Sequence, residues 1–183
     1  MNAKQFLIAF ATVTGGYLLA YFVTHFAVTP VQSQFFPEIT QHASLLFLPH
    51  GVRVLTAWLY GWKSLLLLSP VSVGTGMFFW GVENYGFYDY LAALTGAASA
   101  ALAFGVLAHF GRELRFERRG VIHWRDVFWV GVIASVVNSA GTSLIFDSSV
   151  GVTAVRLAGD ILGLGALLLV MMYGFRVLRS YGR

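Results

Sequence analysis

Three charged residues lie inside long apolar segments, where a charge is costly unless it is paired or solvated. Arg53 lies near the start of one such segment, and Arg156 and Asp160 lie four residues apart in the last one. A spacing of four places Arg156 and Asp160 on one face of a helix. We expect the three residues to cluster with His50, either as an ion pair that locks helices together or as a pocket for an anionic or hydrogen-bonding ligand.

The cluster has two possible pairings. In the preferred one, Asp160 pairs with Arg53 across two helices, and Arg156 faces the mouth of the pocket. In the alternative, Arg156 and Asp160 pair within one helix, which leaves Arg53 free for a ligand. Both leave one positive charge in excess, which an anionic ligand, a lipid headgroup or water must meet.

A stripe of small and polar residues adds to this pattern. Gly131, Ser135, Asn138 and Thr142 are spaced by four, three and four residues, so they share one helix face. Such a face is typical of a close helix contact held by side-chain hydrogen bonds. It also suits a pocket wall in which Asn138 contacts the ligand, and both interpretations stay open.

Sequence patterns of enzymes and metal sites are missing. The chain has no cysteine, and its five histidines form no pair with zinc-site spacing. Ser139 does not lie in a nucleophile elbow, and Asp160 has no carboxylate companion for acid–base catalysis. We therefore predict no catalytic residue, no metal, no cofactor and no enzymatic activity.

The amino-acid composition indicates that these segments lie in a lipid bilayer. The 183 residues are 57% hydrophobic and only 11% charged, whereas a soluble domain carries about 25% charged residues. We predict an all-α membrane helix bundle that forms one domain over residues 1–183 and crosses the lipid bilayer about six times. The predicted spans are Phe6–Val28, Ser44–Trp62, Ser64–Val82, Tyr90–Phe110, Val127–Phe146 and Val152–Leu178. Pro49 and Gly51 predict an irregular entry to the second span.

Basic residues indicate the orientation. With the N-terminus inside, ten of the twelve Lys and Arg residues fall on the cytoplasmic side. An even number of spans then places both termini in the cytoplasm. Only Lys4 precedes the first apolar run, so we expect no cleavable signal. Because the basic residues flank apolar segments and no recognition module accompanies them, we predict no nucleic-acid partner.

The segment FLPHGVRVLTAWLYGWKSLLLLSP resembles the opening of bacterial membrane-associated sensor (MASE) domains, and RLAGDILGLGALLLVM resembles their closing helix. HWRDVFWVGVIASVVNSA, between them, is compatible with the same family. The resemblance covers about Leu48–Met172 and places the family pattern on Pro49, Gly51, Gly61, Gly159 and Asp160. It implies a sensor in the bacterial inner (plasma) membrane. Those domains usually have more spans and precede an output domain, so we expect signalling here to need a separate partner protein.

The architecture is also similar to the substrate-capture subunits of energy-coupling-factor transporters. The first span has small residues at the spacings Ala11-x-x-x-Gly15 and Gly16-x-x-x-Ala20, and the long outer loop Thr29–Ala43 would serve as a lid. That resemblance implies capture of a small solute from outside, with the first helix docking a coupling subunit.

We therefore predict a ligand-binding, sensor-like membrane module that acts with a partner protein. Two alternatives are the capture subunit of a solute transporter and a structural subunit of a membrane complex. The predicted ligand-binding residues are His50, Arg53, Asn138, Arg156 and Asp160.

Overall fold

A computed structural model describes residues 2–40, 43–116 and 123–181, and among these it contains helices and no strands. The α-helices are α1 (Ala3–Val23), α2 (Thr29–Phe35), α3 (Pro37–Thr40), α4 (Leu48–Tyr60), α5 (Ser64–Trp80), α6 (Phe87–His109), α8 (Trp124–Phe146) and α9 (Val150–Tyr181). A π-helical turn (Thr24–Val28) joins α1 to α2, and 3-10 turns lie at Gly61–Lys63 and Val82–Asn84. The predicted all-α class is confirmed for these residues.

Five helical stretches of the described chain are long and apolar enough to cross a membrane. They are Ala3–Phe35, Leu48–Trp80, Phe87–His109, Trp124–Phe146 and Val150–Ser180. Large apolar side chains on their outer faces are exposed, for example Phe78 at 74%, Leu144 at 86% and Leu169 at 68%. Polar side chains such as Ser99, Ser135 and Asp160 are instead buried inside. This distribution is that of a multi-pass membrane protein.

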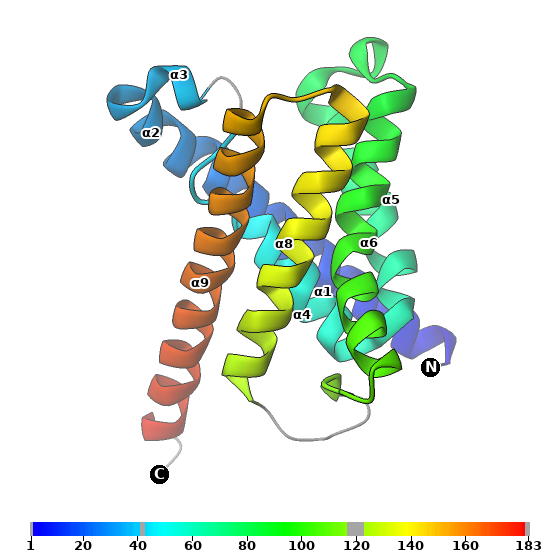
Figure 1. The fold of residues 1–183 in the computed structure, drawn as a ribbon. Helices are drawn as coiled ribbons and strands as arrows, with labels where there is room; N and C mark the ends of the chain where they lie inside the picture. The colour runs from blue at the N-terminus through cyan, green and yellow to red at the C-terminus, as the bar shows by residue number, and fades with distance from the viewer. Residues whose placement is uncertain (1, 41–42, 117–122, 182–183) are drawn as a thin grey trace.

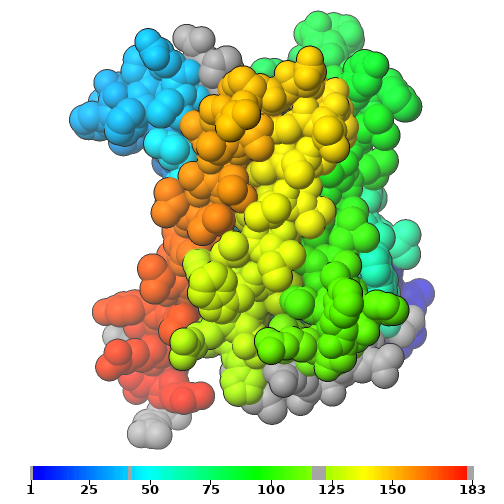
Figure 2. Space-filling model, in the orientation of Figure 1, coloured from blue at the N-terminus to red at the C-terminus, as the bar shows by residue number. Residues whose placement is uncertain are grey.

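The helices form one bundle with both chain ends at the same end (Figure 1). The long helices alternate in direction, α1 crosses behind the others at an incline, and α2 and α3 project from the side of the opposite end (Figure 2). Most predicted cytoplasmic charges belong to elements at the end that carries the termini, among them Lys4, Lys63, Arg112 and Arg179. Arg118, Arg119 and Arg183 lie outside the described residues.

The predicted loop Thr29–Ala43 is wrong as a loop over most of its length. The helical path of α1 continues through the π-helical turn into α2 and ends at Phe35. Pro30 is tolerated because it lies in the first turn of α2, where a missing N–H costs little. A second short helix, α3, follows, and residues 41–42 lie outside the described part.

The irregular entry to the second span is confirmed, and it involves four residues. Helix α4 begins at Leu48 rather than at the predicted Ser44, and Ser44–Phe47 is non-helical. Backbone of this kind survives at membrane depth only where protein groups satisfy it. The Gln32 side chain accepts from Leu45 N–H at 2.7 Å and donates to Ala43 C=O at 3.0 Å. Thr24 Oγ1 accepts from Leu48 N–H at 3.2 Å and donates to Leu46 C=O at 3.4 Å.

Two glycines of α9 form the platform under this segment. Phe47 N–H donates to the carbonyl of Gly159 at 2.9 Å. A Cβ atom on Gly159 would overlap the backbone of Ser44, and one on Gly163 would overlap the backbone of Phe47. The Gly159 and Gly163 positions are therefore fixed by close backbone approach.

The apolar core and the polar interior occupy different ends of the bundle. Near the end with the termini, buried apolar side chains of α4, α6, α8 and α9 pack together, including Val54, Trp58, Phe104, Val130 and Leu164. A second cluster joins α1, α5 and α6 through Val13, Tyr17, Leu67, Leu68 and Ala97. Toward the other end, the facing positions of the same helices are polar or small.

Candidate functional site

A cavity of about 330 Å³ lies in the half of the bundle away from the termini. Every long helix contributes to it. Its lining residues are Tyr17, Tyr21, Ala43, Ser44, Phe47, Arg53, Ser72, Gly76, Trp80, Tyr85, Asp89, Ala92, Ala93, Asn138, Thr142, Phe146, Arg156 and Asp160. Four of the five predicted ligand-binding residues are in this list, and the fifth, His50, lies behind Asp160.

Arg53 is held against the inner wall of the cavity and is only 7% exposed. Its Nη2 donates to the Tyr17 hydroxyl at 2.8 Å. The guanidinium carbon lies 5.6 Å from the Tyr17 ring centre and 5.5 Å from the Phe47 ring centre, which is cation–π distance. It also lies against Gly96, where a Cβ atom would be 2.6 Å from Nη1. Gly96 thus makes room for the guanidinium.

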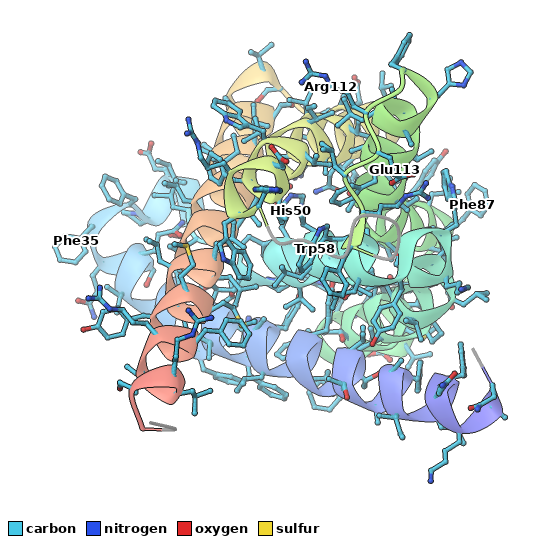
Figure 3. The ribbon with its side chains drawn as sticks, turned by 90° about the horizontal axis from the view of Figure 1, so that it is seen from below. Phe35, His50, Trp58, Phe87, Arg112 and Glu113 are labelled. Atoms are coloured by element: carbon cyan, nitrogen blue, oxygen red, sulfur yellow. The ribbon has the colours of Figure 1, made fainter. Side chains whose placement is uncertain are left out.

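Asp160 pairs with neither arginine, so both predicted pairings are wrong. Its Oδ2 accepts from Asn138 Nδ2 at 2.7 Å and lies 3.5 Å from His50 Nδ1, an ion-pair distance. The side chain of Asp160 is 1% exposed, and that of His50 is 0% exposed. His50 lies in the interior when the bundle is viewed along its axis (Figure 3). The Asn138 amide supplies a donor with less desolvation than a second full charge would require.

Arg156 lines the cavity, and its hydrogen-bond partner is on α8. Its Nη1 donates to Thr142 Oγ1 at 3.1 Å, and that hydroxyl donates to Asn138 C=O at 2.8 Å. The α8 stripe is a packing face at one end and a cavity wall at the other. Gly131 and Ser135 pack against α9 and α4, whereas Asn138 and Thr142 line the cavity.

Ser135, His50 and Asp160 are connected in the order found in serine hydrolases. Ser135 Oγ lies 3.0 Å from His50 Nε2, and His50 Nδ1 faces Asp160. However, Ser135 is fully buried, it does not line the cavity, and its hydroxyl donates to Gly131 C=O at 2.9 Å. No substrate reaches Oγ in this arrangement, so the connected groups fasten α4, α8 and α9 together.

Residues near the ends of α5, α6 and α8 also line the cavity. Trp80 is the last residue of α5, and Phe146 is the last residue of α8. Asp89 lies in the first turn of α6, where its carboxylate accepts from Gly86 N–H at 2.9 Å. Burial, with a smaller contribution from the Asp89 charge, raises the pKa of Tyr85. Tyr85 is therefore a neutral donor at physiological pH, and its hydroxyl donates to Asp89 C=O at 3.2 Å.

Several residues of the site were not singled out from the sequence. Tyr17 lies on a helix whose neighbours are almost all apolar, and Ser72 and Gly76 lie in the segment SPVSVGTG, which reads as a kink next to Pro70. Gly76 leaves space for the Tyr85 ring. His25 contacts Phe26 and Phe79 and does not line the cavity.

The residues that carry the resemblance to sensor domains have packing roles. Pro49 lies in the first turn of α4, and Gly51 leaves room for Leu167. Gly61 ends α4 with φ of +55°, a conformation that favours glycine. Gly159 packs against the Ser44 backbone. Four of the five positions of the family pattern therefore determine how α4 begins, ends or packs, and among the five only Asp160 lines the cavity.

Within the described residues, no group of three or more His, Cys, Asp or Glu side chains is placed to hold a metal ion. The cavity therefore offers charge and hydrogen bonds from side chains. A comparison of the chain with protein-family models, curated proteins and solved structures finds no match.

Proposed function

We propose that the chain is a ligand-binding, sensor-like integral membrane module that takes a small molecule from the outer side and acts with a partner protein. One observation carries the proposal: a cavity of about 330 Å³ that combines charged and aromatic side chains in the half of the bundle away from the termini. Small-molecule sites have volumes of about 300–1,000 Å³ and place a few polar groups among apolar walls. Buried charges inside membrane helices are functional by default.

Native mass spectrometry of gently purified protein tests the proposal. The wild-type chain should carry a small molecule, and Ala93→Phe, which fills the cavity from α6, should lose it. Leu94→Phe is the matched control, because Leu94 is 43% exposed on the outer face of the same helix. A molecule that stays bound in Ala93→Phe, or is lost equally in Leu94→Phe, contradicts the proposed site.

We propose that the chain lies in a bacterial inner membrane and crosses it six times, with both ends in the cytoplasm. In this arrangement Ser44–Phe47 and α4 together make the second pass. Because the chain has no cysteine, single cysteines give clean labelling. At Ser33, Asn84 and Ser149 they should react with an impermeant thiol reagent on intact cells, and at Ser180 only after permeabilisation. Labelling of position 180 from outside would contradict the orientation.

A partner surface is proposed on α1. Its small residues Gly15 and Gly16 are exposed, and an added Cβ atom would meet nothing within 4 Å at either. Small residues of this kind allow another helix to approach closely. Gly15→Leu should therefore leave the chain folded and abolish co-purification of its partner. Gly174→Leu, at an equally open glycine of α9, should keep the partner, and loss of the fold in Gly15→Leu would refute an open face.

One contact supports the alternative function, that of a capture subunit of a solute transporter. Gln32 of α2 holds the backbone at Ala43 and Leu45, next to the cavity wall. A movement of α2 would therefore move that wall, as a lid requires. Co-purification of a pair of ATPase subunits would favour this alternative, whereas a kinase or cyclase would favour the sensor. A stable complex without any bound molecule would favour a structural subunit.

A further inference from the structure

Arg53 has no anionic partner among the described residues. Its nearest polar partner is the neutral Tyr17 hydroxyl, and its Nε has no hydrogen-bond partner in the described part of the chain. Its Nη1 likewise makes no hydrogen bond to the described residues, although Arg53 lines the cavity. A guanidinium buried in this way is costly without an anion.

The other charges at the cavity do not supply that anion. Asp160 is held by Asn138 and His50, and Arg156 adds a second positive charge beside Thr142. Asp89 also lines the cavity, but its carboxylate caps the start of α6 by accepting from Gly86 N–H. Apart from this capping carboxylate, the cavity lining carries two guanidinium groups, Arg53 and Arg156, and one carboxylate, Asp160, so a ligand with one negative charge balances them.

The cavity also offers hydrogen-bond acceptors. Asn138 donates through Nδ2 to Asp160, and its Oδ1 has no partner among the described residues. The hydrogen bond that Asp160 accepts is at Oδ2, which leaves Oδ1 without one in the described structure. Ser72 Oγ, on the α5 side, has no hydrogen-bond partner within the described part of the chain. A hydrogen-bond donor on the ligand would satisfy the α8–α9 side.

The remaining wall is aromatic. It consists of Tyr17, Tyr21, Phe47, Trp80, Tyr85 and Phe146. Aromatic walls favour stacked or edge-on contact with a flat apolar ring. A cavity of about 330 Å³ is at the small end of ligand sites, so one or two fused rings fill it.

We propose that the ligand is a small aromatic acid that also carries a hydrogen-bond donor. This inference rests on the proposed function of the cavity. The carboxylate pairs with Arg53, the ring lies between the aromatic side chains, and the donor faces Asn138 and Asp160. Guanidinium–carboxylate pairing gives both charge balance and directional hydrogen bonds.

Equilibrium dialysis of the purified chain with three matched probes tests this class. Indole-3-acetate, indole-3-acetamide and tryptamine share the ring and its N–H donor and differ in charge. Indole-3-acetate should bind at least tenfold more tightly than the amide, and tryptamine more weakly than both. Arg53→Gln should lower the affinity for the acid at least tenfold and leave the affinity for the amide nearly unchanged. Arg53→Lys should keep the order of the three probes, and Arg179→Gln, an exposed arginine at the other end of the bundle, should behave as wild type.

The order of the probes on the wild-type chain is decisive even if Arg53→Gln does not fold. Equal binding of acid and amide, tightest binding of tryptamine, or binding of none overturns the aromatic-acid class. An unchanged preference for the acid in folded Arg53→Gln overturns the role of Arg53. In these cases a molecule that Ala93→Phe removes would still support the cavity as a site, whereas the absence of any such molecule would refute the proposed function as well.

Discussion

Asp160→Ala is expected to lower the free energy of unfolding by about 1–3 kcal/mol, the cost of leaving a buried hydrogen-bonding group unsatisfied. Asp160 is 1% exposed, accepts a hydrogen bond from Asn138, and lies 3.5 Å from Nδ1 of the His50 ring. Its loss leaves the buried Asn138 amide on α8 without its acceptor and removes the carboxylate that His50 of α4 contacts, so three helices lose a common contact. The measurement is the thermal or denaturant unfolding of the purified variant in detergent.

A swap of the two side chains provides the control. Asp160→Asn alone should destabilise the chain, and Asp160→Asn combined with Asn138→Asp should recover part of the loss, because a carboxylate and an amide again face each other. Combining Asp160→Asn with Arg53→Gln should give no recovery, since Arg53 bonds to Tyr17. Recovery with Arg53→Gln instead would show that the two charges are partners after all.

Gly163→Ala is expected to destabilise the chain by about 1–3 kcal/mol or more, the cost of overpacking. The added Cβ atom would overlap the Phe47 backbone, which cannot rotate away as a side chain can. Because Ser44 and Phe47 line the cavity, the same change should weaken ligand binding. Unfolding and dialysis measurements on one preparation report both effects.

Gly174→Ala is the matched control on the same helix. Nothing lies within 4 Å of a Cβ atom at Gly174, and alanine is better than glycine in a helix by about 1 kcal/mol. This variant should be as stable as wild type or slightly more so. If Gly163→Ala is equally harmless, Ser44–Phe47 does not rest on α9.

The sequence predicted the positions of the buried polar groups better than their partners. The free-energy cost of a charge inside a lipid bilayer is enough to predict that Arg53, Arg156 and Asp160 face the interior of the bundle and lie together. All three do line one cavity. Pairing by opposite charge failed because the helix rotations that bring Asn138 and His50 to the carboxylate depend on packing across four helices. That packing includes Gly96, Gly131 and Gly163, whose partners are not encoded locally.

The predicted helices agree with the structure after Trp62 and disagree in the segment between the first and second spans. The four spans after Trp62 were predicted to within three residues at each end. The errors lie around Thr29–Phe47, where a helix continues past Pro30 and a short extended segment enters the bundle. Gln32 and Thr24 make that path possible through side-chain bonds to distant backbone, and hydropathy carries no signal of such bonds.

The central claim is a cavity that opens outward and carries positive charge. The most direct measurement is the reaction rate of a single cysteine at Ala92, inside the cavity, with membrane-impermeant methanethiosulfonates on intact cells. The account predicts that the cysteine reacts from outside, faster with the anionic ethylsulfonate than with the cationic ethyltrimethylammonium reagent, relative to their rates at exposed Ser149. It also predicts that Arg53→Gln reduces this preference. No reaction in intact cells, or a preference for the cationic reagent, would contradict the account.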